Sequence, residues 1–541
     1  MTMPWRMPQL KGLPWSCCGG MAVMALALAG CAMGPDYQRS SAPVPSQYKE
    51  LEGWKPAAPQ PIDASQPWWA LYEDPLLDQL QRKAVVDNQT LRSWEAAWRQ
   101  AEAMLRQARA GLWPTLSGSA AVRRSGTMGH GNRLELPAGL DNQLGQSLDT
   151  SGFDTSRNRT TYSTSLDAFW DVDLWGRLRR TVESQAANAQ ASAADLAAAQ
   201  LSIQTQLASA YFQLRAQDAR IAILEQAAAA YERSLRITRN KYVAGIVTSA
   251  DVALAQTQLE STRAQAVNAR ISRAQLEHAI AVLTGQPPGD FTLATTALPQ
   301  EVPVVPVGLP STLLERRPDI AAAERRMAAA NAQIGIAQTA FFPDLVLSGS
   351  FGYSSSALDR LFKAASNVWA FGPQLTETLF DAGARSARLA QARAFHEQTI
   401  ADYRSAVLLA FQQVEDELAS LRQLEQQTAI QARALAAARE AERLETNQYL
   451  AGTVDYTNVV TAQQNALDNE QAMLTIQEAR LVSSVALIQA LGGSWQQPAP
   501  GAQPYDHALA PESAPGGQLG PAPANAQPMV SRPAVGRDGN G

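Results

Sequence analysis

The sequence has few of the residues that most enzyme and metal sites require. All three cysteines precede residue 32, and the four histidines stand far apart, at His130, His278, His396 and His507. It contains no cysteine–histidine pairing with metal-ligand spacing, no phosphate-binding glycine loop and no glycine-flanked serine nucleophile. We therefore expect no enzyme activity, no metal site and no cofactor.

Charge and long hydrophobic runs are also scarce. Charged residues make up 18% of the 541 residues, and the net charge of −5 gives no reason to expect a nucleic-acid partner. After residue 35, no charge-free apolar run reaches the roughly 18 residues that a membrane-spanning helix needs. Any part that crosses a membrane would therefore have to be built from β-strands. The apolar content of 46% excludes disorder throughout the chain.

The first 30 residues have the pattern of a secretory signal peptide. Arg6 and Lys11 precede a short apolar core at residues 21–29. The run Leu28-Ala-Gly-Cys31 resembles a bacterial lipobox, in which cleavage falls before the cysteine and a diacylglycerol is attached to its sulfur. We expect Cys31 to anchor the mature chain in lipid, and Ala32 after it, in place of aspartate, resembles the default sorting of bacterial lipoproteins to the outer membrane. An ordinary export signal with a chance cysteine is the alternative.

The body of the chain repeats one large unit. Tyr242-Val-Ala-Gly245 recurs as Tyr449-Leu-Ala-Gly452, and each half reads as helix, two strands, long helix, tight turn and helix. The expected boundaries are residues 1–30 for the signal peptide, 31–74 for the anchored N-terminal segment, 75–290 for the first repeat, 291–310 for a linker, 311–495 for the second repeat and 496–541 for a disordered tail rich in proline, alanine and glycine.

Apolar residues at seven-residue spacing predict coiled-coil packing of unusually long helices. The two longest helices are expected at residues 177–241 and 384–448, the returning helices at 250–284 and 455–491, and a further helix at 311–341. At 1.5 Å per residue, a helix of this greatest length would run about 98 Å. We expect a wall in which one continuous helix lies beside a returning helix stacked on the next repeat's first helix. Such a wall suits crossing a gap better than enclosing a pocket.

Four segments alternate apolar and polar residues in the manner of transmembrane β-barrel strands, and a soluble sheet with one wet face is the alternative. They are expected at about residues 114–126, 159–174, 343–354 and 368–380. On the second, Asp167, Asp171 and Asp173 share the polar face and are predicted to line a pore. Because the smallest barrels have about eight strands and open edges cannot lie in lipid, copies of the chain must pool strands. A dimer would supply eight strands and a trimer twelve.

Several motifs together resemble the TolC-like outer-membrane efflux channels, specifically the NodT-type lipoprotein subgroup, over about residues 31–496. They are Gly34-Pro-Asp-Tyr37, Trp68-Trp69, Asp74-Pro-Leu-Leu-Asp78, Asp171-Val-Asp-Leu-Trp-Gly176, Leu313-Leu-Glu-Arg-Arg-Pro-Asp-Ile320, Phe341-Phe-Pro343, Leu379-Phe-Asp381 and Leu491-Gly-Gly-Ser-Trp495. The resemblance implies an α+β membrane protein and, between the two assemblies left open above, a homotrimer. Its 12-stranded β-barrel would be continuous with a long α-helical coiled-coil barrel in the periplasm.

The resemblance also implies partners and a function. A periplasmic adaptor (a membrane fusion protein) and an inner-membrane pump, usually of the resistance–nodulation–division type, would deliver drugs and small toxic compounds for passive conduction to the exterior. Two other functions stay open: the outer-membrane duct of a type I protein secretion system, and, from another class, a non-channel helical lipoprotein scaffold. The lipobox and the NodT-like motifs favour efflux.

Two helix reversals carry the candidate functional residues. The turns at 243–249 and 450–454 resemble the tips that an adaptor grips, formed by Gly245, Ile246, Val247, Thr248, Ser249, Gly452, Thr453 and Val454. Glycine suits such a reversal, and Thr248 or Ser249, and Asp455, are expected to cap the next helices. Turns without a partner are the alternative.

In the family, the entrance constriction follows the second tip, which places a candidate periplasmic gate at Thr457, Asn458, Thr461 and Gln464. Relatives often have aspartates at the Asn458 or Thr461 positions. Because rings of carboxylates attract cations, their absence predicts a less cation-selective and weakly pH-sensitive gate.

Overall fold

The computed structural model describes residues 32–45, 47–51, 67–126, 158–305 and 316–495. The signal peptide, Cys31, most of the first interstrand loop and the predicted tail lie outside these residues. Among the described residues, no helix combines the length and apolar character needed to span a membrane.

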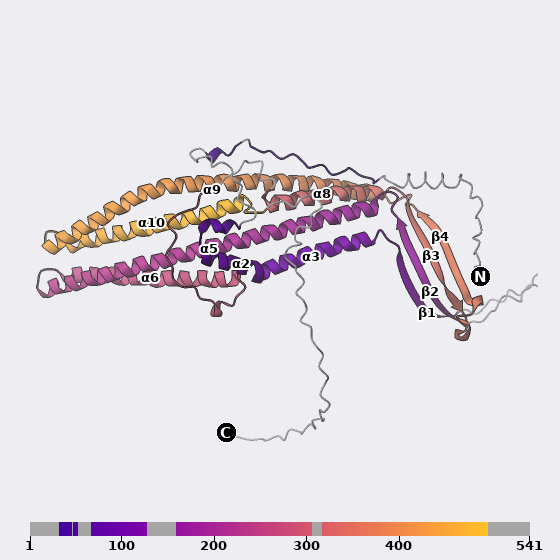
Figure 1. Cartoon of the computed structure of the whole chain (residues 1–541), viewed down its shortest axis with the longest axis horizontal. Helices are drawn as coiled ribbons and strands as arrows, with labels where there is room; N and C mark the ends of the chain where they lie inside the picture. Colours follow the sequence, from indigo (N-terminus) through magenta and orange to yellow (C-terminus); the bar gives the residue numbers. More distant parts are fainter. Residues whose placement is uncertain (1–31, 46, 52–66, 127–157, 306–315, 496–541) are drawn as a thin grey trace, which may run out of the picture. The chain divides into compact units, whose positions relative to one another are not determined.

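The described residues form helices and a single sheet, in the order expected for two repeats (Figure 1). The first repeat contains α2 (Pro75–Asp87), α3 (Gln89–Ala110), β1 (Thr115–Gly126), β2 (Asn158–Val172), α5 (Arg177–Val243) and α6 (Ser249–Leu283). The second contains α8 (Pro318–Thr339), β3 (Asp344–Ser355), β4 (Asn367–Thr376), α9 (Ala384–Ala451) and α10 (Tyr456–Ala490). Short 3₁₀ turns occur at η1 (Lys49–Leu51), η2 (Trp68–Tyr72), η4 (Pro288–Asp290), η6 (Leu358–Arg360) and η7 (Ala364–Ser366).

The two longest helices match in length, with 67 residues in α5 and 68 in α9, and each is followed by a 35-residue helix. The prediction of one helix over 311–341 was wrong, because α8 has only 22 residues. Arg317 is extended, at φ −96° and ψ 119°, and Pro318 occupies the first helical position. Proline disfavours a helical conformation of the residue before it, so a helix begins there instead of continuing through.

Each long helix lies beside two shorter ones, but the pairs differ from the prediction. The end of α6 meets the α2–α3 junction, where Asn88 Nδ2 donates to the Leu283 carbonyl at 2.8 Å. The end of α10 meets the start of α8, where Arg317 Nη1 donates to the Ala490 carbonyl at 3.0 Å. Stacking therefore joins the last and first helices of the same repeat, and not those of consecutive repeats (Figure 1).

Both stacking points depend on a glycine. Gly285 and Gly492 have φ values of +71° and +90°. A Cβ at Gly285 would lie 2.3 Å from the Asp87 carbonyl oxygen, and one at Gly492 would lie 2.1 Å from that of Arg316. No side chain fits at either position, since real Cβ contacts are not this short and L-residues avoid positive φ.

The sheet has the order β1-β2-β3-β4 with every pair antiparallel. The register sets Leu116 opposite Ala168, Ala168 opposite Gly349, and Gly349 opposite Phe371. Because directly opposed residues share a face, the apolar sets of all four strands lie together on one face. The prediction of alternating strands is confirmed, although β2 ends at Val172 and β4 at Thr376, earlier than expected.

The largest apolar cluster lies where α2, α5, α9 and α10 meet, and includes Trp68, Leu207, Phe212 and Leu481, each at most 1% exposed. A second cluster fills the space between the hairpins nearer their turns. Burying such side chains contributes about 1.5–3 kcal/mol each. These contacts hold the α5–α6 and α9–α10 hairpins together.

The N-terminal segment is fixed along α5, α8 and α9. Met33 N donates to the Trp175 carbonyl at 2.9 Å, and Arg180 pairs with Asp36 at 2.9 Å. Tyr37 Oη donates to Glu324 at 3.0 Å. Farther along, Glu50 forms an ion pair with Arg422 of α9. The described segments 33–45 and 47–50 therefore start beside the β2–α5 junction and end against the middle of α9.

Candidate functional site: the helix turns and the channel elements

The first turn reverses the chain between α5 and α6. Gly245 has φ +70°, and Ile246 N donates to the Lys241 carbonyl at 2.9 Å. Thr248 begins α6 with a capping box, in which Asp251 N donates to Thr248 Oγ1 at 3.3 Å and Thr248 N to Asp251 Oδ2 at 2.8 Å. The expected left-handed glycine and the expected cap at Thr248 are both confirmed.

The second turn repeats this design with a different cap. Gly452 has φ +79°, and Thr453 N donates to the Gln448 carbonyl at 3.0 Å. Asp455 lies at the expected N-cap position of α10, but its side chain makes no capping hydrogen bond. A Cβ at Gly245 or Gly452 would meet no atom within 4 Å, so both turns face open space.

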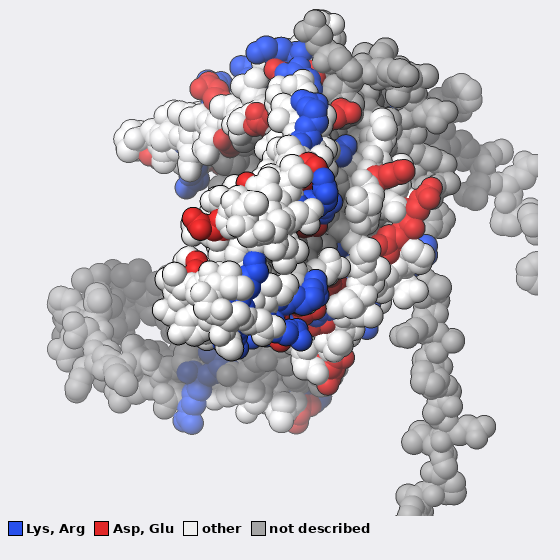
Figure 2. Space-filling view, turned by 90° about the vertical axis from the view of Figure 1, so that its left-hand side faces the viewer, with Lys and Arg blue, Asp and Glu red and all other residues white. Residues whose placement is uncertain are grey.

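The turns expose apolar side chains. Val243 is 86% exposed and Ile246 68% exposed at the first turn, and Leu450 is 52% exposed at the second. In the end-on view, lysine and arginine lie in small groups among aspartate, glutamate and many uncharged residues (Figure 2). A partner that meets this end therefore meets mixed charge and local apolar contacts, with no large patch of one sign.

Polar contacts that the sequence analysis missed tie the two hairpins together near these turns. Lys241 Nζ donates to the Tyr449 carbonyl at 2.6 Å and lies 3.9 Å from the centre of its ring. Thr238 Oγ1 and the Tyr449 hydroxyl are 3.2 Å apart, and Tyr231 Oη donates to the Gln463 carbonyl at 3.2 Å. Burial raises the pKa of Tyr231 to about 12. The signal in the sequence was the placement of these tyrosines at apolar heptad positions.

The candidate gate residues occupy the first turns of α10. Thr457, Asn458 and Thr461 are exposed, and Thr461 Oγ1 donates to the Thr457 carbonyl at 2.9 Å. Gln464 is half-buried, because its Oε1 accepts from Gln258 Nε2 of α6 at 2.9 Å and its Nε2 donates to Asp468 at 2.7 Å. Thr457, Asn458 and Thr461 therefore present polar side chains to solvent on the first turns of α10, whereas Gln464 lies between the two hairpins.

The three predicted pore-lining aspartates have different roles. Asp167 lies within β2 and accepts from Ser165 Oγ at 2.7 Å, and Asp171 pairs with Arg177 at the strand's end. Asp173 lies beyond β2, which corrects its assignment to the strand face. Its carboxylate accepts from the backbone N of Leu178 and Arg179, at 3.0 and 2.9 Å. These bonds satisfy N–H groups that the first turn of a helix leaves unpaired.

The same junction recurs at the start of α9, where Asp381 accepts from Arg385 N at 2.9 Å and pairs with Arg385 Nε at 2.8 Å. Gly176 and Gly383 precede the helices with φ +85° and +91°. Each strand-to-helix passage therefore combines a left-handed glycine with an aspartate that caps a 67- or 68-residue helix.

The family model for outer membrane efflux proteins matches residues 80–286 and 309–493, which covers both repeats. The chain belongs to the outer membrane efflux protein family. As the resemblance implied, this efflux protein is a TolC-like outer-membrane channel component of an efflux pump. It is 31% identical over 479 residues to the probable efflux pump outer membrane protein TtgC of Pseudomonas putida, covering 88% of this chain and 95% of TtgC.

Other relatives agree in sequence and in structure. Identity to the cation efflux system protein CusC of Escherichia coli is 31% over 473 residues, covering 87% of this chain and 98% of CusC. The solved outer-membrane channel OprN superposes with a TM-score of 0.77 at 28% identity, covering 86% of this chain and all of OprN. The open MtrE channel of Neisseria gonorrhoeae superposes with a TM-score of 0.72 at 29% identity, covering 86% of this chain and 99% of MtrE.

Proposed function

We propose that three copies of this efflux protein join their sheets into one 12-stranded barrel that continues into a helical barrel in the periplasm. The observation that carries this proposal is the pair of free edges. Among the described residues, β1 and β4 each have a strand on one side only. Backbone groups cannot remain unpaired in lipid, so each edge needs a strand from another copy.

The outward face of the proposed barrel is the apolar face of the sheet. Trp369 and Phe371 on β4 are 76% and 75% exposed in the single chain, and Leu116 on β1 is 72% exposed. Such side chains favour contact with lipid, while the serines and Asp167 on the opposite face suit a water-filled interior. Asp171 would lie at the periplasmic end of that interior, beside Arg177.

A lipid at Cys31 would lie beside the end of the strands that leads into the helices. Ala32 lies against the β2–α5 junction, since a Cβ at Gly176 would be 2.7 Å from the Ala32 Cα. That junction is where the proposed membrane-spanning strands end and the periplasmic helices begin. Acyl chains on Cys31 would therefore enter the outer membrane beside the barrel, and each buried methylene would add about 0.8 kcal/mol to the anchoring.

The turns at 243–249 and 450–454 would contact a periplasmic adaptor that joins the channel to an inner-membrane pump of the resistance–nodulation–division type. The exposed Val243, Ile246 and Leu450 support this assignment. Efflux relatives support drugs and small toxic compounds as cargo, because the names of related proteins specify toluene, antibiotics and cations. These relatives favour efflux of small compounds over the two other functions, a type I protein secretion duct and a helical scaffold without a channel.

The gate residues Thr457, Asn458 and Thr461 would form neutral polar rings at the periplasmic entrance. We expect single-channel recordings in planar bilayers to show weak cation selectivity, and Asn458→Asp to increase it, because three new carboxylates would surround the pore. Val267→Asp, on the exposed face of α6, is the control. Strong cation selectivity of the unmodified channel that traces to these positions would contradict the neutral rings, and Asn458→Asp without effect on selectivity would contradict the gate assignment.

The efflux role is tested by deleting the gene and measuring dye and drug accumulation. Accumulation should rise in the deletion strain and return to the parental level with the unmodified gene. A gene carrying Val243→Asp and Ile246→Asp, at two exposed positions of the first turn, should fail to restore efflux while its product still conducts ions in bilayers. Restored efflux would refute the adaptor assignment, and an unmodified protein without conductance would refute the channel.

A further inference from the structure

A cavity of about 740 Å³ separates the two repeats at the middle of the helical part. The cavity is open to the surface, and four segments form its walls: α5, the stretch 295–300, α9 and α10. Its apolar lining consists of Ala219, Ala222, Ile223, Leu298, Leu435 and Leu474. The volume falls within the roughly 300–1,000 Å³ of small-molecule sites, which are mainly apolar with a few convergent polar groups.

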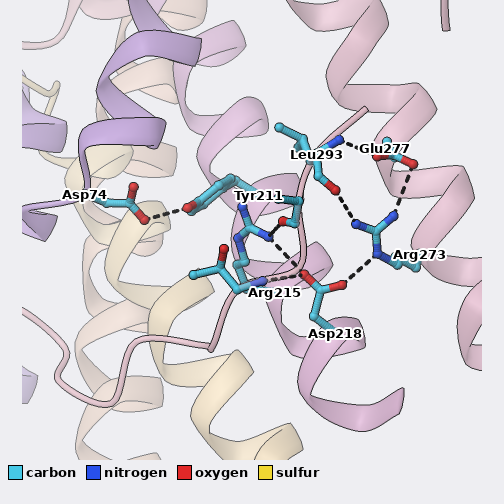
Figure 3. A network of polar contacts seen from close by, with 9 residues as sticks. Asp74, Tyr211, Arg215, Asp218, Arg273, Glu277 and Leu293 are labelled. Atoms are coloured by element: carbon cyan, nitrogen blue, oxygen red, sulfur yellow. Dashed lines mark hydrogen bonds and ion pairs between the residues drawn. The ribbon is translucent and has the colours of Figure 1, made fainter. Parts of the chain in front are cut away.

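A buried network holds one wall of this cavity in place (Figure 3). Asp218, whose side chain is 4% exposed, accepts from Arg215 Nη1 at 2.9 Å and from Arg273 Nε at 2.6 Å. Arg273 Nη2 also donates to the Leu293 carbonyl at 2.6 Å, and Leu293 N donates to Glu277 at 2.6 Å.

The network fixes the chain segment that forms one wall of the cavity. Arg215 Nη1 donates to the Ala294 carbonyl at 2.7 Å, just before the stretch 295–300. Gln477 of α10 holds the other end, because its Nε2 donates to the carbonyls of Pro299 and Gln300 at 2.9 and 2.8 Å. A site with walls fixed in this way needs little ordering when a ligand binds.

The charge beside the cavity is negative in balance. The two oxygens of Asp218 are already paired with arginines, so this carboxylate offers little to a ligand. Across the cavity, Arg439 Nη2 donates to Glu470 Oε1 at 2.6 Å, and Glu470 Oε2 makes no hydrogen bond within the described part of the chain. Burial raises the pKa of Glu442, and Glu470 raises it further, so a second carboxylate lies close to the same arginine. Two carboxylates near one guanidinium leave an unbalanced negative charge, and of the two Glu470 lines the cavity.

We infer that this cavity binds an amphiphilic organic cation, with its apolar body against Ile223, Leu435 and Leu474 and its ammonium group on Glu470 Oε2. The ligand would touch α5 of the first repeat and α9 and α10 of the second, so it would bridge the two repeats. The site does not depend on conduction through the channel.

The test uses the full-length protein in lipid nanodiscs and rhodamine 6G, a fluorescent lipophilic cation, with empty nanodiscs subtracted. Anisotropy titration should show saturable binding of one dye per chain, and anionic fluorescein should show none. Ala222→Phe should abolish saturable binding, because Ala222 faces the cavity and phenylalanine would fill it. Glu470→Gln should weaken binding by about threefold or more, as expected for a partly exposed ion pair.

Two variants serve as matched controls. Ala229→Phe adds the same bulk at an exposed position on the same face of α5, two turns from Ala222, and Glu425→Gln removes an exposed charge from α9. Both should bind the dye as the unmodified protein does, and all four should keep its helical circular dichroism. The proposal is overturned if the unmodified protein shows no saturable binding, if Ala222→Phe binds normally, or if Glu470→Gln leaves the affinity unchanged.

Discussion

The buried Arg215–Asp218 pair offers the sharpest test of how the middle of the molecule is stabilised. The two side chains are 1% and 4% exposed, and Arg215 Nε and Nη2 already lack a hydrogen-bond partner. Asp218→Ala would leave the guanidinium buried without its carboxylate, at a cost of about 3–5 kcal/mol. Replacing both residues, as Arg215→Met with Asp218→Ala, removes the unpaired guanidinium of Arg215 and leaves Arg273 paired with Glu277, so it should recover part of that loss. The exposed pair Arg270–Glu225 gives the control, because Glu225→Ala should cost only about 0.2–1 kcal/mol.

Thermal unfolding of the purified assembly, followed by circular dichroism at one scan rate, measures these differences. Large assemblies commonly unfold irreversibly, so the comparison is between apparent melting temperatures. We expect Asp218→Ala to melt at least about 3 °C below the unmodified protein, and Glu225→Ala to melt within about 1 °C of it. Amides at residues 291–298 should exchange faster in Asp218→Ala, since Thr296 N loses its bond to the Asp218 carboxylate, at 3.4 Å, and Arg215, which holds the Ala294 carbonyl, loses the carboxylate that orients it. Unchanged melting, or a double variant less stable than the single one, would refute the reasoning.

Three further perturbations follow from the fold. Gly492→Ala should prevent or severely weaken assembly because its Cβ would meet a carbonyl oxygen at 2.1 Å, whereas Gly452→Ala, at φ +79° in open space, should cost about 1–2 kcal/mol in melting experiments. Thr248→Ala should destabilise the start of α6 by about 1 kcal/mol and speed local amide exchange there, whereas Ser249→Ala should not. Burial raises the pKa of Glu478, with a nearby arginine opposing, so the folded form holds its proton more tightly than the unfolded chain. The stability gained from the protonated Glu478 side chain is complete below the ordinary glutamate pKa, and it is lost as the pH rises through the raised pKa of the folded protein. Glu478→Gln should therefore gain melting temperature over the unmodified protein as the pH rises from about 4 to neutral, and a constant difference would contradict this.

Much of the fold was predictable because each element has a strong local signal. The heptad spacing around Leu207 and Leu214 gave the long helices, and the alternation at Leu345 and Leu347 gave a strand. Glycine at 245 marked a helix reversal, and Thr248 marked the next helix start. These signals are local, since hydrophobic period and capping chemistry depend on neighbours in sequence.

What could not be predicted depends on contacts between distant residues. The stacking of α6 on α3 depends on how the glycine at 285 fits against the chain near Asn88. The spacing of apolar residues along the sequence does not reveal this contact. Asp173 looked like a strand residue because its parity matched Asp171, yet its carboxylate caps α5. The cavity at Glu470 arises where two repeats meet, and a sequence pattern within one repeat does not show it.

The central claim is that each copy completes its sheet with strands of two neighbours. The most direct measurement places one cysteine on β1 and one on β4, scans the register between them, and determines the covalent mass after oxidation in the outer membrane. We predict a ladder of one, two and three chains that stops at three, and no cross-linked species when either cysteine is moved to the middle strands. Cross-linking that ends at two chains, or continues past three, would contradict the account.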